Sequence, residues 1–286
     1  MSLELANAKI MSNAFSKSIL SDLLKTGKSK KFDLIISSIS NLEIKDKTHG
    51  ELFDLLHLNM IKNYRNEYIY KNAIANKIVL GRHKFKNISF FTELFVWGVI
   101  ADVVVANGTT TAYEIKTAYD SFSRLNNQIG IYKQAFEYVN IVIPESKLSS
   151  LIKIAPDNVG IIILSENFTF QEYRKPISNE ETLSTEIMLS LLHASDKKYV
   201  LKKYFNKELE YKSINDFYNE EKYLLELDSA TMHKELLSSM HKRQYDQQRK
   251  DLVLKSPESL RSILISANYS RPKMKSISNF LEQIYN

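Results

Sequence analysis

Hydrophobic residues recur at two different spacings along this chain of 286 residues, and the change of spacing divides it into parts. Apolar positions over residues 3–24 and 32–42 follow a helical spacing that is broken at Gly27. The helical pattern returns over residues 67–80, and Gly81 is expected to end that helix as a left-handed cap. Residues before this last helix are therefore predicted to form a helical N-terminal extension.

Short runs rich in β-branched and aromatic residues follow Gly81 and predict strands. They are Phe90–Trp97, Asp102–Ala106, Ala112–Thr117, Asn140–Ile143 and Val159–Leu164, with a further candidate at Phe168–Tyr173. Helical patterns over residues 121–138 and 146–154 separate the last three of the five runs. This order predicts an α/β fold, in which a hairpin meander is followed by helix crossovers to parallel strands in one mixed central sheet.

The strand pattern disappears from about Pro176 onward, and the remaining residues show helical spacing. The sequence thus predicts three segments: a helical extension over 1–66, a sheet-containing core over 67–175 and a helical C-terminal region over 176–286. We expect the C-terminal region to bind nucleic acid or a protein partner.

Three charged residues lie on neighbouring predicted strands. Glu114 and Lys116 leave the same face of their strand, because side chains alternate along a strand. The pair Asn107-Gly108 is a strong hairpin signal that returns Asp102 close to Glu114. Two carboxylates beside an ammonium suit a divalent ion, Mg²⁺ or Mn²⁺, that activates water next to a phosphate.

The length of the hairpin loop decides whether the two carboxylates share a face. A two-residue loop would set Asp102 opposite Tyr113, whereas a three-residue loop would set it opposite Glu114. A functional site therefore requires the longer loop or a bulge. The alternative is a structural role, with Asp102 at an exposed strand end or in an ion pair with Lys116.

The segment resembles the PD-(D/E)XK nuclease superfamily, whose motif is an acid on one strand and Glu-x-Lys on the next. Asp102 corresponds to the first acid and residues 114–116 to Glu-Ile-Lys, while Ala101 replaces the proline of the motif. Gln128 and Tyr132 stand one turn apart on the following helix. This pair resembles the Gln-x-x-x-Tyr motif of RecB-like nucleases and strengthens the similarity.

The resemblance implies roles for individual residues. Asp102, Glu114 and the Ile115 carbonyl would hold one or two Mg²⁺ ions, Lys116 would orient the attacking water, and Gln128 would complete the catalytic set. The family often adds an upstream acid, for which both Glu67 and Glu93 are candidates. The nucleic-acid contacts expected on this basis are Arg124, Tyr132 and Arg82.

Composition is consistent with this prediction. The chain has no cysteine, which excludes disulfides and thiolate metal sites, and it has no apolar run of about 20 residues that would cross a membrane. We therefore expect a cytoplasmic protein. Its formal charge of +6 is matched by a surplus of six basic residues between 242 and 275, nine against three acids.

The surplus of basic residues near the C-terminus predicts further phosphate contacts. The candidates are Lys242, Arg243, Arg249 and Lys250. A solvated helix face or a surface for an acidic protein partner would produce the same pattern.

Together these features predict a metal-dependent nuclease acting on DNA, with a role in phage defence or in the biology of mobile elements. Two alternatives remain open. One is a non-catalytic nucleic-acid-binding module, and the other is a subunit of a larger assembly that is inactive without its partner.

Overall fold

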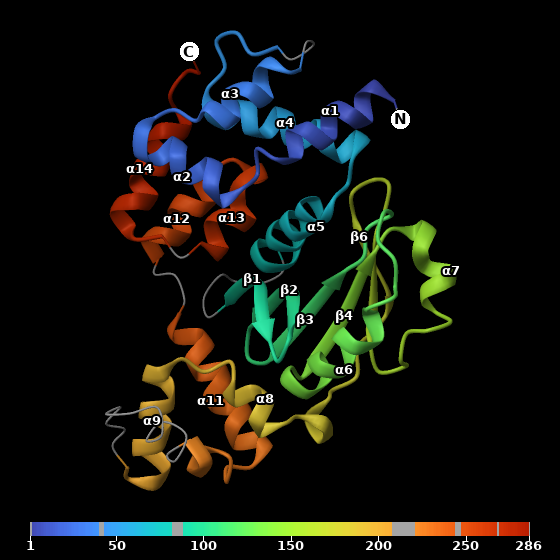
Figure 1. The fold of residues 1–286 in the computed structure, drawn as a ribbon, viewed down its shortest axis with the longest axis vertical. Coiled ribbons are helices and arrows are strands. Elements are labelled where there is room, and N and C mark those ends of the chain that lie inside the picture. The colour runs from blue at the N-terminus through green and yellow to red at the C-terminus, as the bar shows by residue number, and fades with distance from the viewer. Residues whose placement is uncertain are drawn as a thin grey trace.

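A six-stranded mixed sheet forms the centre of the protein in the computed structural model (Figure 1). The structure describes residues 2–39, 43–81, 88–207, 221–243, 247–267 and 269–285. The strands lie side by side in chain order: β1 Ser89–Val96, β2 Val99–Ala106, β3 Thr110–Ile115, β4 Tyr138–Ile143, β5 Gly160–Leu164 and β6 Phe170–Arg174.

Strand direction changes where the connections change from turns to helices. β1, β2 and β3 form an antiparallel meander, whereas β4 and β5 continue from β3 in parallel. Helix α6 (Leu125–Ala135) connects β3 to β4, and α7 (Leu148–Leu151) lies between β4 and β5. β6 returns antiparallel to β5. The predicted mixed sheet with helices at both ends of the chain is confirmed.

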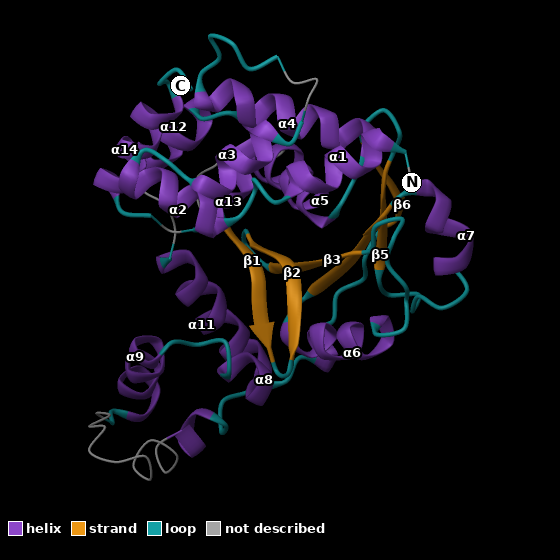
Figure 2. Ribbon diagram, turned by 45° about the horizontal axis from the view of Figure 1, so that its top comes forward, coloured by secondary structure: helices purple, strands orange, loops and turns teal. Residues whose placement is uncertain are grey.

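Each face of the sheet packs against its own set of helices, because side chains alternate along the strands. Val103 and Val105 point into one core, and Val104 and Ala106 point into the other. The first core includes α5 (Glu67–Ala73) and the N-terminal helices. The second includes α6 and the helices that immediately follow the sheet, within residues 185–242 (Figure 2).

The N-terminal helices begin at polar caps, as their sequences predict. They are α1 Leu3–Ser12, α2 Lys17–Thr26, α3 Lys30–Ser37 and α4 His49–Asn63. Ser2, Ser16, Ser29, Thr48 and, before α5, Asn66 each accept a hydrogen bond from a backbone amide in the first turn. These caps satisfy donors that would otherwise lack an intrahelical partner.

The expected left-handed cap at Gly81 is wrong. α5 continues into the π-helix η1 (Ile74–Leu80), and Gly81 keeps a right-handed backbone with φ −87°. A Cβ at this position would lie 2.8 Å from the Lys77 carbonyl oxygen. Close approach of the backbone, and not a positive φ, is therefore what a larger residue would disturb here.

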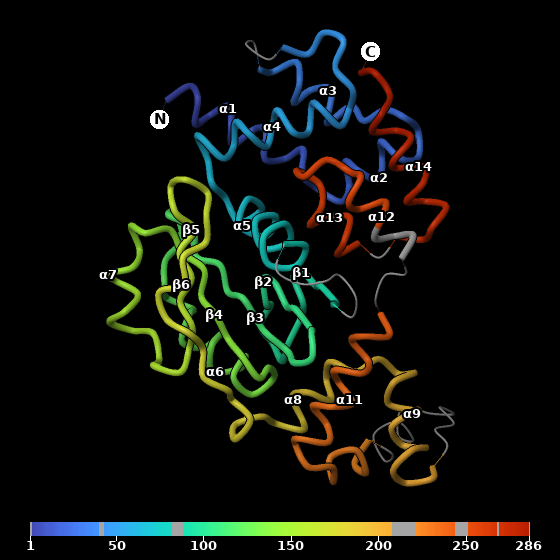
Figure 3. The backbone as a smooth tube through the Cα atoms, turned by 180° about the vertical axis from the view of Figure 1, so that it is seen from behind, coloured from blue at the N-terminus to red at the C-terminus, as the bar shows by residue number. Residues whose placement is uncertain are grey.

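The C-terminal third of the chain occupies two separate places. α8 (Thr185–Leu189), α9 (Ala194–Phe205) and α11 (Ser229–Lys242) contribute to the second core. The last helices join the N-terminal helices instead (Figure 3), and they are α12 Gln247–Lys255, α13 Arg261–Ser266 and α14 Arg271–Leu281. The predicted segment 176–286 is thus divided in space.

Among the helices of the described ranges, none combines the length and the apolar character needed to cross a membrane.

Candidate active site

The site lies where β2 and β3 separate. Their pairing runs from Ala106 and Thr110 to Val103 and Tyr113, and stops there. Beyond that point β2 pairs only with β1, while β3 continues beside β4. The edges of β2 and β3 that face each other have no strand partner here, so side chains can lie between them.

A three-residue loop sets this register. The Asn107 amide donates to the Thr109 carbonyl at 2.8 Å, and the loop occupies residues 107–109. Continuing the register by one residue brings Asp102 beside Glu114. Of the two loop lengths compatible with the sequence, the longer one is observed, and it gives the carboxylates a common face.

Asp102 takes the place of a strand partner. Its Oδ2 accepts a hydrogen bond of 2.7 Å from the Ile115 amide, which lies past the end of the β2–β3 ladder. Burial, followed by the negative charges of Glu114 and Glu67, raises the pKa of Asp102 to about 8. Without a bound metal ion, the site therefore favours a protonated Asp102 at neutral pH.

Glu114 is held on both of its oxygens. Its side chain is only 1% exposed; Oε1 lies 2.5 Å from Lys116 Nζ, and Oε2 lies 2.9 Å from the Tyr132 hydroxyl. Burial raises the pKa of Glu114, whereas the ammonium of Lys116 and hydrogen bonds from Tyr132 and Gln128 act in the opposite direction. The carboxylate is fixed in orientation before any ligand arrives.

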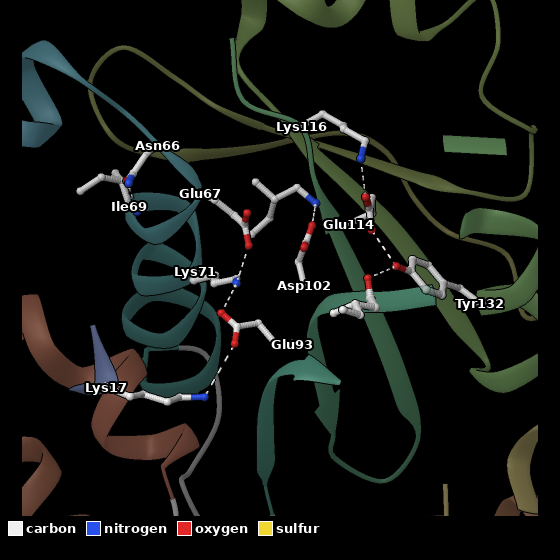
Figure 4. A network of polar contacts seen from close by, with 12 residues as sticks. Lys17, Asn66, Glu67, Ile69, Lys71, Glu93, Asp102, Glu114, Lys116 and Tyr132 are labelled. Atoms are coloured by element: carbon white, nitrogen blue, oxygen red, sulfur yellow. Dashed lines mark hydrogen bonds and ion pairs between the residues drawn. The ribbon is translucent and has the colours of Figure 1, made fainter. Parts of the chain in front are cut away.

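Helix α6 supplies Gln128 and Tyr132, which help to fix this orientation. Figure 4 shows Tyr132 on one side of Glu114 and Lys116, which follows β3, on the other. Gln128 Oε1 accepts from Lys116 Nζ at 3.1 Å, so α6 positions the ammonium. The Tyr132 hydroxyl also lies 2.6 Å from the Ile100 carbonyl and shares its single hydrogen between two acceptors. It thereby ties β2 and β3 together beyond the end of their ladder.

The expected contact of Tyr132 with nucleic acid is wrong for this conformation. The residue is 0% exposed, and its burial raises the pKa of the phenol far above the ordinary value. The helical spacing correctly brought Tyr132 to the site. Only packing shows that it faces Glu114 and not solvent.

Both candidate upstream acids lie on the α5 side of the site and bind the same lysine. Lys71 Nζ forms an ion pair with Glu67 one turn earlier and lies 3.2 Å from Glu93 Oε1 (Figure 4). Lys17, at the start of α2, lies 3.8 Å from the other oxygen of Glu93. Neither acid is excluded by position, and Glu67 is close enough to raise the pKa of Asp102.

The site offers few side-chain ligands for a divalent ion. Within the described ranges, no three Asp, Glu, His or Cys side chains gather closely enough to hold a metal ion. Mg²⁺ often needs only one or two carboxylates, because it retains several waters. Asp102 and Glu114 are close enough to interact electrostatically and supply the two carboxylates of this smaller requirement.

The remaining predicted contacts are scattered. Arg124 is exposed at the start of α6, one turn before Gln128. Lys242 is exposed, with Nζ 4.0 Å from the centre of the Tyr199 ring. Arg243 is only 16% exposed and binds Asp196 at 3.1 Å, so its expected role in phosphate contact is corrected to a structural one.

Three of the predicted nucleic-acid contacts cannot be placed. Arg82 lies outside the described residues. Arg249 and Lys250 belong to α12, but their side chains are not among those the structure describes.

Sequence reasoning missed Lys71 and Lys17. Lys71 follows Glu67 by four residues, a spacing at which a glutamate and a lysine meet on a helix surface. This signal was present in the sequence. Lys17 has no comparable signal, because its contact with Glu93 joins residues far apart in the chain.

The family model described as "Bacteriophage P4 protein cII" matches residues 60–268. Protein cII of enterobacteria phage P4 is 30% identical over 116 residues, which cover 40% of this chain and 40% of that protein. A protein of unknown function from Silicibacter pomeroyi aligns in structure over 47% of this chain and 92% of its own, at 12% identity. Its TM-score of 0.29 is too low to bear on fold or function.

Proposed function

The chain belongs to the bacteriophage P4 protein cII family, and we propose that it is a metal-dependent nuclease that hydrolyses phosphodiester bonds in DNA. One observation carries the proposal: β2 and β3 separate at Asp102 and Glu114, where Lys116 and two residues of α6 converge. The arrangement is the one that the PD-(D/E)XK resemblance implies.

The residues divide the work between binding and orientation. Asp102, Glu114 and the Ile115 carbonyl would hold the ion. A divalent ion bound there would supply Lewis acidity toward a phosphate oxygen and lower the pKa of water. Lys116 presents an ammonium that can donate to a phosphate oxygen and stabilise the charge that develops on it. Gln128 holds that ammonium, and Tyr132 holds Glu114.

Affinity for DNA is expected from exposed cations on α6 and α11. Arg124 lies one turn before Gln128 on α6 and is exposed, so it is placed to meet a phosphate. Lys242 is exposed on α11 and belongs to the basic C-terminal group. Both contacts would be independent of base sequence.

The biological setting is part of the proposal. A family named after a phage protein supports a role in mobile-element biology or phage defence, and such a nuclease would act on DNA in the cytoplasm.

The experiment is cleavage of linear, circular and single-stranded DNA with Mg²⁺, Mn²⁺ or EDTA. Asp102→Asn is the matched control, because asparagine preserves the shape and the acceptor for the Ile115 amide. Cleavage that requires the ion and is lost in the variant supports the proposal. Calorimetric titration with Mn²⁺ accompanies the assay.

Ion binding without cleavage would favour the subunit that needs a partner. Absence of ion binding together with DNA affinity would favour the non-catalytic binding module. Cleavage that persists in EDTA would refute the metal-dependent mechanism.

A further inference from the structure

Lys71 is a buried lysine in a position that the proposed chemistry does not use. Its side chain is 9% exposed, and its ammonium lies between the carboxylates of Glu67 and Glu93. Figure 4 shows Glu67 and Lys71 extending from α5 toward the strands, and Glu93 extending from β1 to meet Lys71. An ammonium this deeply buried requires close anionic partners, and two are present.

The backbone at Glu93 supports a specific role for this contact. Thr92 pairs with Val103 and Leu94 with Ala101, so Glu93 is the residue that register would set opposite Asp102. That pair is absent, and Glu93 has φ 55° within the strand. A left-handed glutamate inside a strand is strained and persists only where its surroundings hold it.

In this strained conformation, Glu93 pairs with lysines. Glu93 is bound on Oε1 by Lys71 and approached on Oε2 by Lys17, at 3.2 and 3.8 Å. Both oxygens therefore face ammonium groups. Glu67 is likewise engaged by Lys71. The two upstream acids are satisfied by lysine without any ion.

Lys71 also lies within electrostatic range of the proposed ion ligand. Figure 4 shows Lys71 and Glu67 on the α5 side of Asp102, with both side chains directed toward it. A second divalent ion bound by Glu67 and Glu93 would have to displace this ammonium or remain beside it. An ammonium and a divalent ion that share the same two carboxylates repel each other strongly in a partly buried site.

We infer that Lys71 is a built-in cation that occupies the place of a second metal ion, so that the proposed active site takes one divalent ion per chain. Glu67 and Glu93 then serve Lys71 and not the metal. This inference rests on the proposed function, and it selects one ion from the one or two that the resemblance allows. Lys71 is a positioning residue, which sets the charge on the α5 side of Asp102.

The test is calorimetric titration with Mn²⁺, which measures the number of ions and not catalysis. Wild type is expected to bind one ion per chain. Lys71→Met removes the ammonium and leaves Glu67 and Glu93 unpaired, so the variant is expected to bind a second ion. Lys17→Met is the matched control, because it removes an exposed ammonium from the same Glu93 and should leave the number at one.

A further variant keeps the inference testable even if Lys71→Met does not fold. Glu93→Gln retains Glu67 as a partner for Lys71 and should change the Mn²⁺ dissociation constant by less than about threefold. A loss of ten-fold or more would make Glu93 a metal ligand and overturn the inference. Two ions in wild type, or one ion in a folded Lys71→Met, would also overturn it.

The proposed function fails in a different way. Wild type that binds no Mn²⁺ at the Asp102 site, with an isotherm unchanged in Asp102→Asn, would reject the metal site itself. One ion in wild type that is lost in Asp102→Asn would uphold the site, and the Lys71 variants would then decide the inference alone.

Discussion

The polar network around Asp102 has two halves that contain similar groups in different surroundings. In the β3–α6 half, Glu114 and Lys116 have side chains only 1% and 9% exposed, and Gln128 and Tyr132 complete their hydrogen bonds. In the α5–β1 half, Lys71 is buried but Glu67 and Glu93 are 49% and 60% exposed. Both halves contain Glu–Lys pairs.

The two halves differ in how far solvent reaches their carboxylates. Where solvent reaches the carboxylate, it can replace a lost partner, and an exposed ion pair contributes little to stability. Where solvent is excluded, removal of one partner leaves an uncompensated charge. The β3–α6 half should therefore be intolerant of change and hold the chemistry, whereas the α5–β1 half should adjust the charge around it.

The largest expected effect is on cleavage. Asp102→Asn should reduce ion-dependent cleavage by a factor of about 10³ or more, because it removes a ligand charge from the site. Glu93→Gln should reduce it less than tenfold. Initial rates at saturating DNA and Mg²⁺ would measure both. Equal losses would show that the two halves share the chemistry and would break the comparison.

The next effect is on stability. Glu114→Gln should lower the free energy of unfolding by about 3 kcal/mol, because Lys116 is left buried without its carboxylate. Glu67→Gln should lower it by less than about 1 kcal/mol, since that carboxylate is half exposed. Chemical denaturation in EDTA would compare the two variants. Similar losses would mean that exposure does not separate the halves.

A third effect depends on pH, and its sign follows from Asp102. The carboxyl has a pKa of about 8 in the folded protein against an ordinary value of 3.8, so between these values the folded state binds more protons. The free energy of unfolding of wild type should therefore fall as pH rises through this range. Asp102→Asn lacks this dependence and should become the more stable protein at high pH.

The size of this pH effect can be bounded. At pH 9 in EDTA, Asp102→Asn should exceed wild type by at least about 1.4 kcal/mol, the equivalent of one pKa unit, and the advantage should shrink toward pH 5. Asp157→Asn, at a fully exposed aspartate, is the control and should follow wild type. A constant difference across pH would contradict a raised pKa at Asp102.

The smallest effect tests how α6 supports the site. Tyr132→Phe removes the hydroxyl near Glu114 and the Ile100 carbonyl and should lower the free energy of unfolding by about 1 kcal/mol, since the buried Glu114 carboxylate loses a donor. Tyr119→Phe, at a tyrosine 56% exposed, should be neutral. Thermal and chemical denaturation would measure both. A neutral Tyr132→Phe would show that the phenol fills space without orienting Glu114.

The sequence predicted the elements and part of the site because these depend on neighbours along the chain. Strand alternation sets Glu114 and Lys116 on one face, and helical spacing sets Gln128 and Tyr132 one turn apart. The Asn107-Gly108 turn required only a choice between two loop lengths. Turn sterics and the periodicity of hydrophobic residues in strands and helices therefore determined the order of elements and the face that carries Asp102.

Tertiary packing decided what the period could not. The sequence allowed two registers for Asp102, placed Tyr132 toward nucleic acid and treated 176–286 as one region, yet the structure selects one register, buries Tyr132 and divides the C-terminal helices. The meeting of Lys17 and Glu93 joins residues 76 positions apart by number. Such contacts depend on which faces exclude water together, and that is a property of the whole fold and not of any local pattern.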